Sequence, residues 1–194
     1  MRASIRSIVS SHATAATILI RVLVGMVFLS EGIQKFIFAT ELGAGRFSHI
    51  GIPAPEVMGP FVGVVEIVAG VLILLGLLTR PAALVLLVNI SVAILSTKIP
   101  ILLGHGFWVF TLPKLQRYGF WSMAHEVRTD FCMCLGCLFL AIVGAGTLSV
   151  DGWLESHLED AHSLKANLTG EPAMRDIPAT TLPKDNPGSE SKPK

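Results

Sequence analysis

The chain has 194 residues, of which 52% are hydrophobic and only 15% are charged. Soluble domains carry about 25% charged residues, so this deficit indicates an integral membrane protein and argues against a soluble enzyme or a disulfide-rich secreted domain. The net charge of +1 offers nothing to attract a polyanion, and no nucleic-acid partner is expected. Charged residues are much denser after position 150 than before it, which predicts a polar tail after the membrane domain.

Four stretches are long and apolar enough to cross the hydrocarbon core as helices, which takes about 20 residues each. They cover residues 15–39, 57–78, 82–103 and 131–150, and together they predict an all-α, four-helix membrane domain over residues 15–150. The first stretch is too long for the apolar part of a signal peptide and contains Arg21, so we expect it to be retained.

The segments between the stretches differ in character. Residues 79–81 make a minimal connection, so the second and third helices are expected to form a tight antiparallel hairpin. Residues 104–128 form a longer loop rich in aromatic residues, which either lies in the membrane interface or folds into an aromatic cluster of its own. Residues 1–14 precede the domain, a short surface helix is predicted within 151–170, and the proline-containing tail 171–194 is predicted to be disordered.

Two carboxylates, Glu31 and Glu66, fall within the predicted spans at the same level. Each lies eight or nine residues from the side that carries the two longer loops, or roughly 12–14 Å below that surface. Gly63 and Gly70 flank Glu66 at helical spacing, so its side of the helix should pack closely on a neighbour and point Glu66 into the bundle. Lys35 and Lys98 reach the same level.

These four residues, Glu31, Lys35, Glu66 and Lys98, predict a polar pocket that could hold a quinone head group or relay protons. A network of ion pairs that only orients the helices explains the same charges, with Lys35 neutralising Glu31. A metal site built from Glu31, Glu66, His105 and His125 has no support from H-x-x-x-H or E-x-x-H spacing among them, so no metal site is predicted. Asn89 is interpreted as a hydrogen-bonding contact between helices.

All three cysteines lie between residues 132 and 137, and Cys134 and Cys137 form a C-x-x-C within the fourth stretch. Residues three apart on a helix lie about 5–6 Å apart, within disulfide reach, so this pair is a candidate for redox thiols. The favoured interpretation is that these cysteines are small apolar residues that pack between helices.

Several short motifs resemble the DoxX family of small four-helix membrane proteins. They include Arg21-Val22-Leu23-Val24-Gly25, Val65-Glu66-Ile67-Val68-Ala69-Gly70, Gly76-Leu77-Leu78-Thr79-Arg80-Pro81, and a closing G-x-G-x-x-S-x-D from Gly144 to Asp151. The resemblance spans residues 21–151 and implies a four-helix bundle in a bacterial inner membrane.

The same resemblance implies a function only loosely, because the family takes its name from a subunit of a thiosulfate:quinone oxidoreductase. Our hypothesis is therefore a subunit of a quinone-linked membrane oxidoreductase system, with a quinone as the candidate cofactor and a redox subunit as the candidate partner. The alternative is a non-catalytic membrane scaffold or a carrier of a small solute. Whether the chain is itself an enzyme is left open.

Overall fold

The computed structural model describes residues 15–154 and 156–157 of the chain. The helical elements are α2 (Thr17–Ile37), α3 (Ala44–Ile50), α4 (Pro55–Leu75), α5 (Thr79–Ala93), the π-helix η1 (Ile94–Lys98), α6 (Ile99–Leu103) and α7 (Phe120–Val143). Within the described residues no strand forms, and the only extended pairing is an isolated bridge between Phe107 and Phe110. The predicted all-α class is confirmed.

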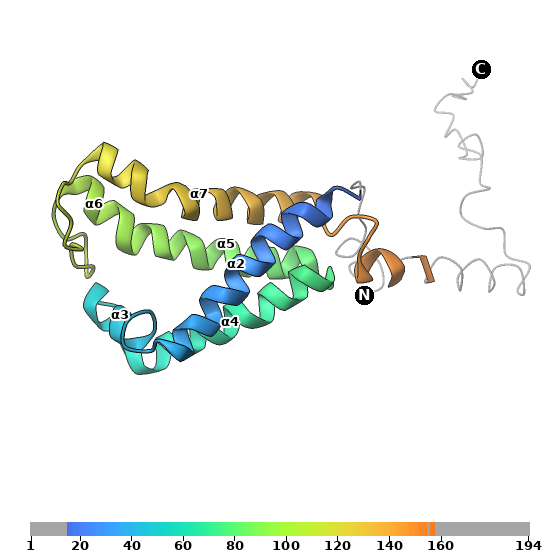
Figure 1. Cartoon of the computed structure of the whole chain (residues 1–194), viewed down its shortest axis with the longest axis horizontal. Helices are drawn as coiled ribbons and strands as arrows, with labels where there is room; N and C mark the ends of the chain where they lie inside the picture. Colours follow the sequence, from blue (N-terminus) through green and yellow to red (C-terminus); the bar gives the residue numbers. More distant parts are fainter. Residues whose placement is uncertain (1–14, 155, 158–194) are drawn as a thin grey trace, which may run out of the picture. The chain divides into compact units, whose positions relative to one another are not determined.

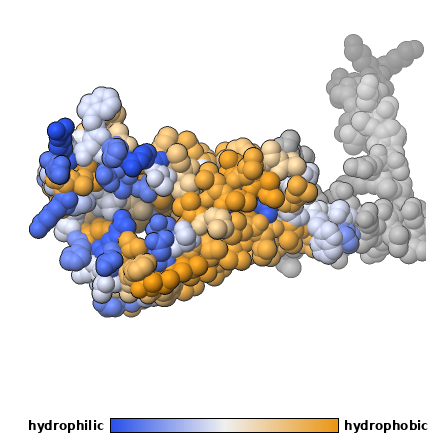
Figure 2. Space-filling view, in the orientation of Figure 1, coloured by the Kyte–Doolittle hydropathy of each residue, from blue (hydrophilic) through white to orange (hydrophobic). Residues whose placement is uncertain are grey.

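In the part of the chain that the structure describes, three helices are long and apolar enough to cross a membrane: α2, α4, and the continuous run of α5, η1 and α6 from Thr79 to Leu103. The fourth long helix, α7, has 24 residues, but its first turns are polar. Hydrophobic side chains cover most of the described surface, whereas hydrophilic ones gather at the end that carries α3 and α6 (Figure 2). This distribution is that of a helix bundle whose middle faces lipid.

The long helices associate in two pairs, α2 with α4 and α5 with α7 (Figure 1). The pairs lie close together at the end where α4 turns into α5, and they diverge toward the end that carries α3 (Figure 1). The apolar core fills the space between them with residues from all four helices, among them Val24, Ile73, Leu86 and Leu140, which are completely buried.

Glycines allow α2 and α4 to approach closely. A Cβ atom on Gly32 would lie 2.7 Å from the Gly63 carbonyl oxygen, and one on Gly70 would lie 3.0 Å from the Gly25 carbonyl oxygen. The predicted small-residue face beside Glu66 is thus confirmed as the surface that packs on a neighbouring helix. Because both helices carry glycine at the contact, their backbones fix the level at which α2 side chains meet α4.

A buried arginine joins the ends of three segments. Arg21 is 2% exposed, and its Nε donates to the Ile73 carbonyl at 2.9 Å. One terminal nitrogen donates to Leu74 at 2.6 Å, and the other to Ala145 at 3.2 Å and Leu148 at 2.5 Å. The positive charge lies at the carboxyl end of α4, where the helix dipole favours a cation and the last carbonyls lack partners within the helix.

Asp151 performs the complementary task at the start of α5. Its carboxylate accepts hydrogen bonds from the backbone N–H groups of Leu78 at 2.9 Å and Thr79 at 3.1 Å. The connection between α4 and α5 is therefore residues 76–78, not 79–81 as predicted. Gly76, with φ of 69°, ends α4 before Leu77, and the carboxylate cap allows α5 to begin at Thr79.

The fourth helix was placed wrongly from the sequence, because α7 spans 120–143 instead of 131–150. Polar residues between Glu126 and Asp130 line a cavity within its first half, so hydropathy does not reveal where it begins. It ends early because Gly144 and Gly146 adopt φ values of 90° and 83°, and the segment that follows turns its carbonyls onto Arg21. The aromatic loop is correspondingly shorter, at residues 104–119, and Phe120 and Trp121 belong to α7.

The chain divides into two units, residues 1–155 and 156–194. The predicted surface helix of 151–170 is described only in part, with helical backbone at 150–154 and 156–157. The N-terminal segment 1–14 and the predicted disordered tail 171–194 lie outside the described residues.

Replacing Arg21 should destabilise the bundle strongly. Arg21→Met leaves four carbonyls without their charged donor, and each buried group that loses its partner costs about 1–3 kcal/mol. We expect the melting temperature in detergent to fall by about 8 °C or more, and Arg21→Lys to give an intermediate value because one ammonium cannot reach all four carbonyls. Arg117→Ala, at an exposed position, is the control. An unchanged melting temperature for Arg21→Met would contradict this account.

Candidate functional site

The two helix pairs enclose a cavity of about 800 Å³ where they diverge. Its walls are mostly apolar, with side chains such as Phe28, Val62 and Ile90, and hydrophilic groups surround the hollow at the end near α3 (Figure 2). The cavity brings together all four residues of the predicted polar pocket, which are Glu31, Lys35, Glu66 and Lys98. Four acidic and four basic side chains line it: Glu31, Glu66, Glu126, Asp130, Lys35, Arg46, Lys98 and Arg128.

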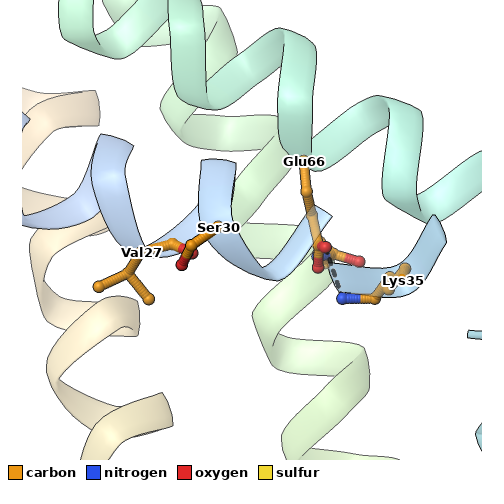
Figure 3. A network of polar contacts seen from close by, with 5 residues as sticks. Val27, Ser30, Lys35 and Glu66 are labelled. Carbon is orange, nitrogen blue, oxygen red and sulfur yellow. Dashed lines mark hydrogen bonds and ion pairs between the residues drawn. The ribbon is translucent and has the colours of Figure 1, made fainter. Parts of the chain in front are cut away.

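Deep in the cavity, Glu66 is held by partners from two other helices. The Lys35 ammonium lies 2.5 Å from Glu66 Oε2, and the Asn89 amide donates to Oε1 at 2.8 Å. Figure 3 shows Lys35 of α2 and Glu66 of α4 pointing toward one another, whereas the Ser30 hydroxyl donates to the carbonyl of Val27 on its own helix. Glu66 is 5% exposed, so the contact is a buried ion pair with a third, neutral partner.

A second ion pair lies nearer the polar end. Lys98, the last residue of η1, contacts the Asp130 carboxylate of α7 at 3.2 Å. The wider turn of the π-helix places three consecutive residues, Ser96, Thr97 and Lys98, on the cavity wall. Such turns are rare and occur often at functional sites.

Glu31 differs from the other deep side chains. It lines the cavity beside Glu66, and the two carboxylates repel one another. The ion pair predicted between Lys35 and Glu31 does not form, since Lys35 contacts Glu66 instead. Within the described part of the chain, no hydrogen bond or ion pair engages the Glu31 carboxylate. It is therefore a half-buried acceptor that faces open space.

The aromatic loop crosses the polar end of the cavity from α6 to α3. The Thr111 N–H donates to the Ile50 carbonyl at 2.9 Å, and the Thr111 hydroxyl donates to the His49 carbonyl. Val109 and Phe110 of this loop line the cavity, whereas Trp108 at its tip is 91% exposed. The loop thus connects the two helix pairs across the polar end of the cavity. The exposed indole of Trp108 is what we expect of a residue at a membrane interface.

The cysteines lie apart from the cavity. Cys137 is completely buried in the apolar core, and Cys134 packs against the same core. All three thiols are free, with Cys132 exposed on the outside of α7. Among the described residues, no group of three histidine, cysteine or carboxylate side chains is placed to hold a metal ion.

Sequence reasoning missed two contributions to the site. Asn89 was interpreted as a contact between helices, and it is that, but its partner is the central carboxylate. Arg46 was not considered, because a short glycine-bounded helix in a predicted loop gives no signal that it lines a cavity. A polar amide within an otherwise apolar stretch was a usable signal for Asn89; nothing local to the sequence pointed to Arg46.

Comparison with known proteins identifies the family to which the chain belongs. The DoxX family pattern matches residues 16–99. An uncharacterized membrane protein of Mycobacterium tuberculosis, Rv3486, is 52% identical over 136 residues, covering 70% of this chain and 79% of that protein. The chain belongs to the DoxX family. No solved structure matches this DoxX protein. Family membership confirms an integral membrane protein, and it leaves the activity to be argued from the cavity.

The Lys35–Glu66 contact should behave as one energetic unit. Glu66→Gln leaves the Lys35 ammonium buried without its counter-charge, and Lys35→Met leaves the Glu66 carboxylate buried without its own. Each change should cost about 3–5 kcal/mol of stability. We expect the double variant to cost clearly less than the sum of the two, as measured by thermal unfolding in detergent. Glu56→Gln, exposed on the same helix, is the control. Strictly additive losses would show that the two side chains do not interact.

Replacing the two candidate redox thiols should have little effect. Changing Cys134 and Cys137 to alanine together removes two small apolar side chains, and we expect a loss of roughly 1–2 kcal/mol with ligand binding to the cavity unchanged. The measurements are thermal unfolding and quinone binding on the same sample. A strong loss of a redox activity in this variant would instead assign the thiols a chemical role.

Proposed function

We propose that this DoxX protein binds a quinone head group in its cavity and serves as a subunit of a quinone-linked oxidoreductase system in a bacterial inner membrane. The observation that carries the proposal is the cavity itself, which combines apolar walls with charged groups at one level inside the helix bundle. A quinone has the matching character, a small polar ring on a long apolar chain.

The dimensions support this ligand. Small-molecule sites are clefts of about 300–1,000 Å³ with mainly apolar walls and a few polar groups that fix orientation, and the cavity of about 800 Å³ falls in that range. Ionisable residues inside membrane spans are costly and frequently mark substrate or proton pathways. Glu31 and Glu66 meet that description, and two ion pairs hold the groups around them in place.

A quinone exchanges electrons with a donor, and we assign that task to a redox partner subunit. The chain contributes the lipid-embedded site, and the partner supplies or accepts the electrons. Such a subunit would dock at the hydrophilic end of the surface (Figure 2), and the cavity lining offers it polar residues such as Glu126 and Arg128.

The second candidate is a non-catalytic scaffold or a carrier of a small solute. The ion pairs favour it, because Lys35–Glu66 joins α2 to α4 and Lys98–Asp130 joins η1 to α7, which is what charges that only orient helices would do. Glu31 favours the ligand site, because a scaffold has no use for a cavity-lining carboxylate that forms no hydrogen bond or ion pair with the described residues.

Quinone binding can be tested directly. Protein purified in detergent from native membranes should carry quinone that organic extraction releases, and should bind added short-chain ubiquinone or menaquinone saturably, near one per chain. Ala93→Phe, which places a ring in the cavity, should weaken binding about tenfold or more. Val88→Phe, on an exposed face of α5, is the matched control. A clean protein that binds neither quinone, with no redox subunit copurifying, would favour the scaffold or carrier.

A further inference from the structure

The hydrogen-bonding groups deep in the cavity are unequally committed. Each of these donors has at least one acceptor: Lys35 and Asn89 donate to Glu66, and the hydroxyls of Ser96 and Thr97 donate to the Ala93 carbonyl at 3.2 and 2.6 Å. The carboxylate of Glu31, by contrast, accepts no hydrogen bond from the described residues. A ligand that enters the cavity therefore meets an acceptor that requires a donor.

From this imbalance we infer that the cavity selects the reduced form of its ligand, a quinol, over the oxidised quinone, and that Glu31 makes the selection. The inference rests on the proposed function and names which redox form occupies the site. A quinol carries two O–H groups, each of which donates and accepts, whereas a quinone carries two carbonyl oxygens that only accept. An ionised carboxylate only accepts, so it bonds a quinol and repels a quinone oxygen.

Donors near the site do not reverse this preference. Arg46 lines the cavity from α3, and its guanidinium can donate to a quinone carbonyl or equally to a quinol oxygen. A donor of this kind binds both forms, so it adds affinity without discrimination. Only an acceptor-only group distinguishes the two forms.

Glu66 does not share this role, although the sequence ranked the two carboxylates together. Both of its oxygens are bonded, one to an ammonium and one to an amide. Glu31 lies at the same level on α2, with the Lys35 charge four residues away turned toward α4 (Figure 3). The structure thus separates a carboxylate that holds the helices together from one that faces the ligand.

The test compares the affinities of short-chain ubiquinol and ubiquinone for the detergent-purified protein under argon, with excess reductant in the quinol series. We expect the quinol to bind about tenfold more tightly, as a charge-assisted hydrogen bond provides. Glu31→Gln, whose amide donates as well as accepts, should bring the two affinities within about threefold, chiefly by strengthening quinone binding. Glu56→Gln should leave the wild-type ratio unchanged.

The outcomes separate the two proposals. If neither form binds the wild-type protein, the quinone site itself is wrong. If the quinone binds as tightly as the quinol, the site stands and the selection by Glu31 is overturned, as it also is by a ratio that Glu31→Gln leaves unchanged. Should Glu31→Gln fail to fold, Glu31→Ala serves in its place, and the wild-type ratio alone still decides whether the quinol is preferred.

Discussion

The position of Arg21 determines how the rest of the bundle is arranged. Its guanidinium donates hydrogen bonds to carbonyls near the end of α4 on one side and to the carbonyls of residues 145 and 148 on the other. Asp151 accepts hydrogen bonds from N–H groups at the start of α5. Backbone groups at helix ends cannot be left unpaired inside a bilayer, where no water replaces the missing partner. Three helix ends are therefore fixed at one place. With that end closed, the two helix pairs can separate only toward the other end, which is where the cavity lies (Figure 1).

Close contact between α2 and α4 then determines which charged side chain pairs with Glu66. Because Gly32 meets Gly63 and Gly25 meets Gly70, the two backbones touch just below and above Glu66. Lys35 consequently reaches Glu66 across the contact instead of turning back to Glu31 on its own helix. The glycines and the ion pair support one another: the backbone contact brings the charges into register, and pairing the charges removes the cost of burying Glu66 alone.

Much of this site could be predicted from residue spacing. The rest could not, because it depends on contacts that form only when the chain folds. Hydropathy located three spans, and counting residues at 1.5 Å each placed Glu31, Glu66 and the two lysines at one level, where the cavity collects them. Spacing could not tell which lysine partner Glu66 would take, because that depends on which backbones touch. Hydropathy also failed for α7, since the polar turn that carries Glu126, Arg128 and Asp130 faces a cavity that exists only after folding. The π-helix, one extra residue in a turn, leaves no mark in the composition.

The residues by which the chain resembles its family fall largely on the interactions that hold the fold. Arg21 and Asp151 close one end, Gly25 and Gly70 bring α2 onto α4, and Glu66 joins the same two helices through its ion pair with Lys35. Glu31, Arg46 and Lys98 are outside those motifs, and all three line the cavity. A shared fold therefore does not determine which ligand the cavity binds. Proteins built on the same closed end can differ in what the open end binds, and in this chain we propose that the carboxylate of Glu31 makes that choice.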